Sequence, residues 1–189
     1  MLKFNGKVMK FGNVWGAAGS VTPPEPLDEV QIGTQIWKTK NLAIDDGGTG
    51  IVHFDNVSAN GVNFGTQYYY TRAAALRIAD TIDGWHVPSK EEFSILSHYL
   101  GENAGTKLKS TYGWEVNGTD EYGFTGLPVG ASWGNAIYYA GQRARYITST
   151  TNCMVELQGI ANGTSNNMLY FWNSYTYNDN MLVRLVKDA

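Results

Sequence analysis

Only a few residues in this chain have the type and spacing of a catalytic site. The clearest match is at residues 130–134. They read Gly-Ala-Ser-Trp-Gly, the G-x-S-x-G pattern of a serine nucleophile at a strand-to-helix turn. Such a site needs a helix after the serine and a histidine further along the chain. Here a strand-like run, 136–140, follows, and all three histidines precede Ser132. We therefore expect Ser132 to be a turn residue and the protein not to be an enzyme.

Metal-binding residue types are sparse in this chain. His53, His86 and His98 are too widely separated for a sequence-local metal site, and no paired-ligand spacing links them. Cys153 is the only cysteine, so the chain can form neither an intrachain disulfide nor a cysteine zinc cluster. It lies in the alternating run 153–158, where one side of a strand would be buried, so we expect an inert thiol. We expect no metal and no cofactor.

Overall composition narrows the range of partners. The 189 residues are 43% hydrophobic, enough for one main domain with a good core. Only 16% are charged and the net charge is −3, so the chain lacks the basic surface that nucleic acids or anionic membranes attract. Residues 1–7 include two lysines where a signal peptide would be apolar, and no run of about twenty apolar residues occurs. We expect no nucleic-acid partner, no membrane insertion and no signal peptide.

Residues 132–180 have an unusual composition. They hold eight of the sixteen asparagines and six of the twelve tyrosines, but only four charged residues. Binding surfaces favour such side chains, because rings give contact area at low entropy cost and amides give adaptable hydrogen bonds. Tyrosine and asparagine are also common in the strands and polar turns of ordinary domains. The composition alone therefore leaves both a ligand-binding surface and a plain β-rich segment open.

The elements that would position these residues begin with a short separate unit. In residues 1–19, Asn5-Gly6 lies between two strand-like runs and predicts a two-residue hairpin turn. Residues 20–28 hold three of the five prolines and predict a stiff linker. Period-two patterns begin at residue 29. We predict a hairpin attachment segment at 1–19, a linker at 20–28 and a ligand-binding domain at 29–189.

Two helices are predicted in the main domain. Thr71 can cap a helix over 72–80, and Ser89 with Glu92 forms a capping box for a helix over 90–100. No later helix signal is found, and two helices followed by a β-rich tail predict an α+β fold. The tail consists of short β-prone runs at 123–129, 136–140, 145–149, 153–157, 168–172 and 181–186.

A series of short motifs also occurs in the order of a known bacterial domain family. The motifs are Ile32–Trp37, Asn41-Leu42, Tyr69–Thr71, Gly84–Ser89, Glu92-Phe93, Gly105–Ser110, Gly123–Gly130 and Val183–Asp188. Through them, residues 30–188 resemble the Fibrobacter succinogenes major paralogous domain. The resemblance implies a C-type-lectin-like fold with two helices and a β-rich C-terminal half, here preceded by the short N-terminal β-hairpin.

The resemblance also carries implications for function. Similar domains occur in bacterial surface proteins and in phage or prophage proteins that diversity-generating retroelements diversify in the C-terminal half of the lectin fold. These retroelements mutate adenines, which makes asparagine codons preferred targets, and the asparagine-rich tail is similar to such a product. Calcium-dependent sugar-binding lectins use Glu-Pro-Asn or Gln-Pro-Asp together with Trp-Asn-Asp. This chain has neither triplet and reads Trp-Asn-Ser at 172–174, which does not favour calcium-mediated sugar binding.

The leading hypothesis is a non-enzymatic receptor- or ligand-binding protein with a diversified surface, such as a phage or prophage tail protein on the virion or at the cell surface. Its partner would be a protein or glycan receptor on a bacterial cell, and residues 1–19 would join it to a phage particle or a homo-oligomer. The alternative is a bacterial surface adhesin for glycans or proteins. The candidate ligand-binding residues are Asn135, Tyr138, Tyr139, Arg143, Asn152, Met154, Glu156, Asn166, Asn167, Tyr170, Trp172, Tyr175, Tyr177, Asn178 and Asn180.

Overall fold

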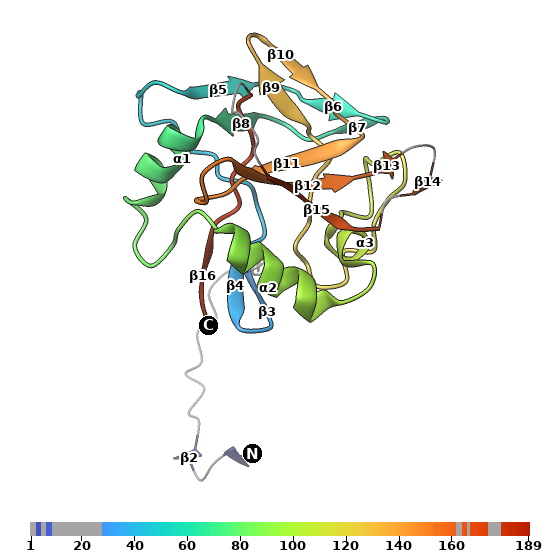
Figure 1. Ribbon diagram of the computed structural model, residues 1–189. Coiled ribbons are helices and arrows are strands. Elements are labelled where there is room, and N and C mark those ends of the chain that lie inside the picture. The colour runs from blue at the N-terminus through green and yellow to red at the C-terminus, as the bar shows by residue number, and fades with distance from the viewer. Residues whose placement is uncertain (1–2, 5–6, 9–27, 162–163, 166, 174–178) are drawn as a thin grey trace, which may run out of the picture.

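The computed structural model of the chain describes residues 3–4, 7–8, 28–161, 164–165, 167–173 and 179–189. Within these ranges it is an α+β protein with three helices and many short strands (Figure 1). The helices are α1 (Arg72–Ala79), α2 (Lys90–Leu100) and α3 (Ala104–Leu108). The strands are β1 (Lys3–Phe4), β2 (Lys7–Val8), β3 (Glu29–Ile32), β4 (Gln35–Lys38), β5 (Ile51–Phe54), β6 (Ser58–Ala59), β7 (Val62–Asn63), β8 (Gln67–Tyr70), β9 (Ala131–Trp133), β10 (Ala136–Tyr138), β11 (Arg143–Ile147), β12 (Cys153–Gln158), β13 (Ile160–Ala161), β14 (Thr164–Ser165), β15 (Leu169–Asn173) and β16 (Val186–Asp188).

The first two helices start where the sequence predicts. The Thr71 hydroxyl accepts a hydrogen bond from the backbone N–H of Ala74 at 3.3 Å, which caps α1. At α2 the Ser89 hydroxyl accepts from the Glu92 N–H at 3.1 Å, and the Glu92 carboxylate accepts from the Ser89 N–H at 2.7 Å. This is the predicted capping box, and it satisfies two N–H groups that would otherwise have no partner at the helix start.

The third helix, α3, was not predicted, and the expectation of only two helices is wrong. It spans five residues and follows Asn103, which has a φ of 62° and makes no capping hydrogen bond through its side chain. Its position depends on packing: a Cβ on Gly105 would lie 2.3 Å from the Met168 carbonyl oxygen, just before β15. A helix held by such a close tertiary contact has neither the length nor the cap that a sequence pattern could show.

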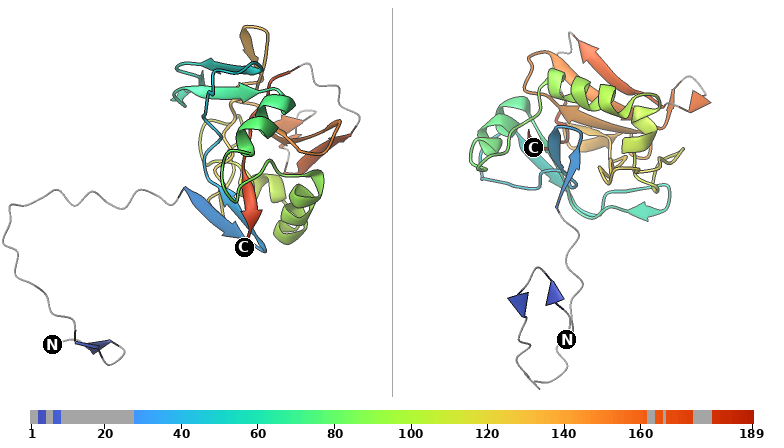
Figure 2. Two further views of the ribbon diagram at one scale, coloured as in Figure 1. Left: turned by 90° about the vertical axis from the view of Figure 1, so that its left-hand side faces the viewer. Right: turned by 90° about the horizontal axis from the view of Figure 1, so that it is seen from below.

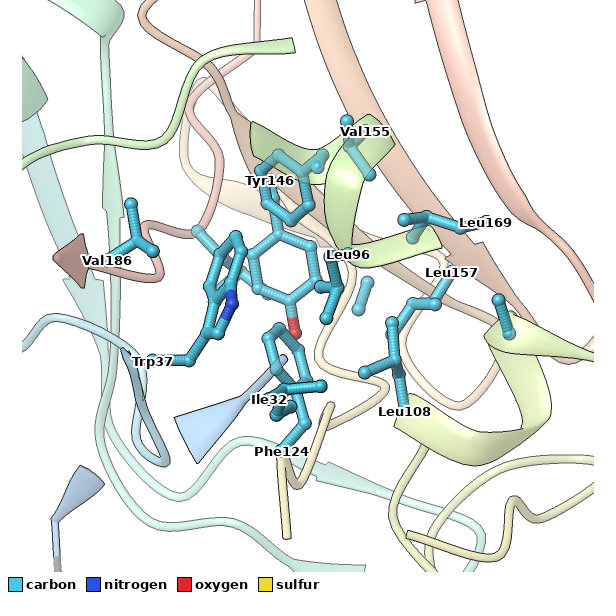
Figure 3. Packing of buried hydrophobic residues seen from close by; sticks show 14 of the residues in the cluster. Ile32, Trp37, Leu96, Leu108, Phe124, Tyr146, Val155, Leu157, Leu169 and Val186 are labelled. Atoms are coloured by element: carbon cyan, nitrogen blue, oxygen red, sulfur yellow. The ribbon is translucent and has the colours of Figure 1, made fainter. Parts of the chain in front are cut away.

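The centre of the domain is the antiparallel sheet β11-β12-β15, with α2 packed against one face of it (Figures 1 and 2). On this inner face Val155 and Leu157 of β12 meet Phe93 and Leu96 of α2 in one apolar cluster. Figure 3 shows the cluster, in which the rings of Trp37, Phe124 and Tyr146 lie together and Leu96 lies beside Tyr146. The sequence predicted that only alternate residues of β12 would be buried. The whole strand is buried, because β11 and β15 flank it and both of its faces are covered.

The C-terminal segment 181–186 crosses the centre of the domain instead of forming the predicted strand. Met181 pairs with Tyr70, and Leu182 pairs with Tyr146, each as an isolated bridge. Because successive residues pair with different partners, no continuous ladder forms until β16. This strand pairs with one edge of β4, and β3 pairs with the other edge (Figure 2). The run 123–129 is likewise not a strand, and it makes one bridge from Gly126 to Lys109.

Arg184 is a fully buried cation in this crossing segment. Its guanidinium donates to the carbonyl oxygens of Lys38 (3.0 Å), Thr125 (3.3 Å) and Phe124, and to the Asn41 side-chain oxygen (2.8 Å). It also lies 4.4 Å from the centre of the Phe124 ring. Burial lowers the pKa of Arg184 from its usual value. The side chain therefore fastens the C-terminal segment to the first strands and to the loop before β9.

The N-terminal hairpin has the predicted register where it is described. Lys3 pairs with Val8 and Phe4 pairs with Lys7. The remainder of 1–27, including nearly all of the predicted linker 20–28, lies outside the described residues. The predicted division into attachment segment, linker and binding domain stays a prediction.

Replacing Arg184 with lysine is expected to destabilise the fold strongly. A single ammonium cannot reproduce a planar group that reaches four acceptors on three segments, so buried carbonyls lose their donors. We expect Arg184→Lys to lower the free energy of unfolding by about 3 kcal/mol or more in urea titrations. Arg77→Lys is the matched control, because Arg77 pairs with Asp46 on the surface, and it should cost less than about 1 kcal/mol. Equal losses in the two variants would contradict the role of Arg184.

Lys109 is a second buried cation, placed just after α3. Its Nζ donates to the carbonyl oxygens of Val116 (3.1 Å) and Gln158 (3.2 Å) and lies 5.3 Å from the centre of the Trp114 ring. Burial disfavours the charged form and lowers the pKa of Lys109 to about 8. In the unfolded chain the pKa of this lysine would be about 10.4.

This difference predicts that stability rises with pH between about 8 and 10, because the unfolded state then binds more protons than the folded state. From pH 7.5 to 9.5 we expect the free energy of unfolding of the native chain to gain roughly 1–2 kcal/mol relative to Lys109→Met. Above that range the buried Tyr70, whose pKa burial raises to about 12, acts in the opposite direction. Parallel curves for the two proteins over this pH range would show that Lys109 does not titrate as described.

Candidate ligand-binding face

The face of the central sheet that points away from α2 carries polar and aromatic side chains. Directly opposed residues of β11, β12 and β15 share a face, and pairs such as Arg145 with Glu156 and Glu156 with Tyr170 lie on this one. We call it the outer face and define it by Arg143, Arg145, Ile147, Met154, Glu156, Gln158, Tyr170 and Trp172. Ile147 and Met154 are covered by a second apolar cluster that includes α1, so the remainder of the face is its polar part.

A buried cluster of charged groups occupies the middle of the outer face. Glu156 is completely buried, and its carboxylate accepts from Arg145 Nε at 2.6 Å and from Arg143 Nη1 at 3.4 Å. The Gln158 amide also donates to it. Arg145 makes a second ion pair, to Asp179 at 2.9 Å. Two arginines thus balance two carboxylates, so the cluster is neutral, and the buried carboxylate is fully paired.

Tyr139 covers this cluster from the loop before β11. Its ring centre lies 4.4 Å from the Arg143 guanidinium and 4.7 Å from that of Arg145. The residue has a φ of 63°, a left-handed conformation that is strained for a bulky side chain, and its carbonyl accepts from the N–H groups of Gln142 and Arg143. The turn therefore holds the ring over the two arginines, where cation–π attraction stabilises it.

The β9–β10 hairpin extends the surface with a row of exposed rings. Trp133, Tyr138 and Tyr139 are 62%, 44% and 43% exposed, and neighbouring ring centres are 6.3 and 6.5 Å apart. The hairpin is tied to the crossing segment, because the backbones of Ser132 and Asn180 exchange two hydrogen bonds of 2.8 Å. Rings of this kind on a rigid hairpin can supply a large contact area with little loss of entropy on binding.

Ser132 is placed differently from its prediction as a turn residue. It lies inside β9, and the chain then turns at 134–135 into β10, so a strand follows the serine and no helix does. Its side chain is 1% exposed, and the hydroxyl oxygen has no hydrogen-bond partner within the described ranges. The strand-to-helix geometry that activates such a serine is absent here.

The predicted binding residues fall into several locations. Tyr138, Tyr139, Arg143, half-buried Tyr170, exposed Trp172 and half-buried Asn180 lie on or beside the polar outer face. Asn135 is exposed at the tip of the β9–β10 turn, and Asn152 is exposed in the turn between β11 and β12. Asn167 is exposed beside α3, where its side-chain oxygen accepts from the Thr106 hydroxyl at 2.8 Å. Met154 and Glu156 share the face but are buried, so they support it from below.

Four predicted residues, Asn166, Tyr175, Tyr177 and Asn178, lie outside the described residues. Sequence reasoning also missed Arg145, Ile147 and Gln158 of the outer face, and Trp133 and Asp179 beside it. Strand alternation from Arg143 and Glu156 would have indicated Arg145 and Gln158. Trp133 directly precedes the Gly134-Asn135 turn, which is a hairpin signal. Asp179 gives no such signal, because only the fold brings it to Arg145.

In the described part of the chain, no group of three or more histidine, cysteine, aspartate or glutamate side chains is arranged to hold a metal ion. Of the helices described, none has the length and apolar character needed to cross a bilayer.

Fold and face together define an α+β protein with a ring-rich polar surface on one side of a small sheet. The family model described as the Fibrobacter succinogenes major domain matches residues 30–187, so the chain belongs to this family. This confirms the family resemblance derived from the sequence motifs. Comparison with curated proteins and with solved structures found no match.

Removing the buried carboxylate of the outer face should be costly. Glu156→Ala leaves the two arginines close together without the group that separates their charges, and we expect the free energy of unfolding to fall by about 3 kcal/mol or more. Glu121→Ala is the control, because Glu121 is exposed and should change stability by less than about 0.5 kcal/mol. Urea denaturation followed by circular dichroism measures both, and a small effect of Glu156→Ala would refute the supporting role of the cluster.

Proposed function

We propose that this protein is a non-enzymatic ligand-binding protein with a C-type-lectin-like fold, and that it binds its target through the polar outer face and the β9–β10 hairpin. The observation that carries the proposal is the continuous row from Trp133 through Tyr138 and Tyr139 to Arg143, exposed above and fixed below by the buried charge cluster. Trp172, 43% exposed on β15, adds a further ring to the same face.

The division between inner and outer face supports a surface that can vary in sequence. Backbone pairing and the inner-face residues Val155 and Leu157 hold the sheet, while exposed rings such as Tyr138 contribute little to the core. Replacing exposed residues of this kind changes stability only slightly. Diversification by a retroelement, as in phage or prophage receptor-binding proteins, would therefore be tolerated at such positions.

The neutral charge cluster favours a role in ligand binding, and not in catalysis, for this face. The carboxylate of Glu156 is buried and accepts hydrogen bonds from Arg143, Arg145 and Gln158, so it is engaged as a structural acceptor. A general base needs a lone pair directed at the substrate. The target we propose is a protein or glycan receptor on a bacterial surface.

The test uses the fluorescently labelled intact chain and envelope fractions from a panel of bacterial strains. We expect saturable binding to some strains, and we expect Trp172→Ala and Tyr138→Ala each to weaken it about tenfold, because hot-spot rings contribute at least 1.4 kcal/mol. Thermal unfolding should show that both variants still fold.

Tyr99→Ala is the matched control, since this tyrosine is 57% exposed on α2 and lies away from the outer face. It should bind like the native chain. Absence of binding to every strain, or equal losses in all three variants, would contradict the proposal. Diversification is tested separately by sequencing the neighbouring DNA for an adenine-biased near-copy of the codons for 132–180 beside a reverse-transcriptase gene.

A further inference from the structure

A cavity of about 450 Å³ lies outside the outer face, where four segments of the domain meet. Its lining comes from residues 39–43, 64–68, Tyr112 and the loop 125–127. The volume is within the range of small-molecule sites, which combine apolar walls with a few fixed polar groups. None of the lining residues belongs to the outer face or to the β9–β10 hairpin.

Aromatic rings form one wall of the cavity. The rings of Phe64 and Tyr112 are stacked, with centres 6.3 Å apart and planes inclined by 20°. Tyr112 is 43% exposed. Phe64 is held closely, because a Cβ on Gly113 would come within 2.3 Å of its ring. The wall is therefore a broad apolar plane that is open to a ligand on one side.

Two amide side chains in the lining have one end fixed and the other end unpaired. Gln67 is 9% exposed, and its amide N–H donates to the Phe64 carbonyl at 2.8 Å. Its oxygen accepts no hydrogen bond within the described ranges. Asn41 has its oxygen on Arg184, and its buried nitrogen has no partner among the same residues. Of the two, only the Asn41 nitrogen is a fully buried polar atom without a partner in the described part of the chain, which is unusual in a folded protein; the Gln67 oxygen is an acceptor left free for a ligand.

The cavity is also rigid where its backbone is strained. Thr125 has a φ of 51°, an outlier for a β-branched residue. The Asp120 carboxylate accepts hydrogen bonds from the Thr125 N–H (2.7 Å) and from the Thr125 hydroxyl (2.8 Å). The Thr125 carbonyl in turn accepts from Arg184. Strain that several contacts maintain is concentrated at ligand sites in known structures.

We propose that this cavity is a second binding site and that its ligand is a neutral saccharide. A sugar ring presents C–H groups on one face, which pack on an aromatic plane, and hydroxyl groups at its edge, each of which both donates and accepts. Those hydroxyls match the free acceptor of Gln67, and the C–H face matches the plane of Phe64 and Tyr112. A neutral ligand is favoured over an anion, because Lys40 is the one charged residue in the lining and it is paired with Asp28 at 2.9 Å.

The test is a titration of the ¹⁵N-labelled full-length chain with six sugars, followed by NMR. The sugars are glucose, galactose, mannose, N-acetylglucosamine, cellobiose and lactose, each taken to high-millimolar concentration. At least one should shift the signals of residues 39–43 and 64–68, including the side-chain amide of Gln67, and the shifts should saturate. Tyr112→Ala should weaken that binding about tenfold, because an exposed ring contributes its stacking contact without supporting the core.

Tyr99→Ala and Trp172→Ala are the controls, and both should bind the sugar like the native chain. The second control separates the two proposals, because Trp172→Ala should weaken binding through the outer face only. The inference fails if no sugar shifts these signals, if the shifts are confined to the outer face, or if Tyr112→Ala binds with native affinity. Shifts of the same signals by inorganic phosphate but by none of the sugars would also overturn it.

Discussion

The burial of one cation, Arg184, is the constraint on which the remainder of the structure depends. A guanidinium removed from water needs hydrogen-bond acceptors. Here the acceptors for the two terminal nitrogens come from β4, Asn41 and the Phe124–Thr125 loop, while Nε has no partner among the described residues. The C-terminal segment is therefore held at the centre of the domain, between the first strands and the central sheet.

The same segment also supports the outer face and the β9–β10 hairpin. Its backbone bonds β11 through Leu182, and the residues just before it bond β9 through Asn180 and bring Asp179 to Arg145. The buried charge cluster is thus assembled from β11, β12 and the residues just before this segment, and the rings of the hairpin rest on it through Tyr139. A surface supported in this way keeps its backbone when exposed rings change, because ladder pairing is made by the backbone and the ring side chains lie outside the inner-face core. The cavity lined by Gln67 and Tyr112 shares this support, since Arg184 also bonds the Asn41 side chain and the Thr125 carbonyl.

Local signals in the chain predicted much of the fold but only part of the site. Thr71, Ser89 and Glu92 predicted the starts of two helices, because capping hydrogen bonds join residues only a few positions apart. The alternating runs around β10, β11, β12 and β15 located those strands to within a few positions. The prediction failed for α3 and for 181–186, where each residue is placed by a different distant partner. Met154 and Glu156 have residue types that suit a binding surface, yet their burial follows from the central position of β12.

The sequence by itself determined the class of the domain, the start of its main helices, the family, and the enrichment of amides and rings in the tail. These properties depend on composition and on spacing within a few residues. Only the tertiary structure decided which of the tail residues share one face, that Arg143 and Arg145 are balanced by Glu156 and Asp179, and that Gln67, Asn41 and Tyr112 line one cavity. The physical reason is that charge pairing, burial and cavity shape depend on contacts between residues far apart in the chain, for which local patterns carry no signal.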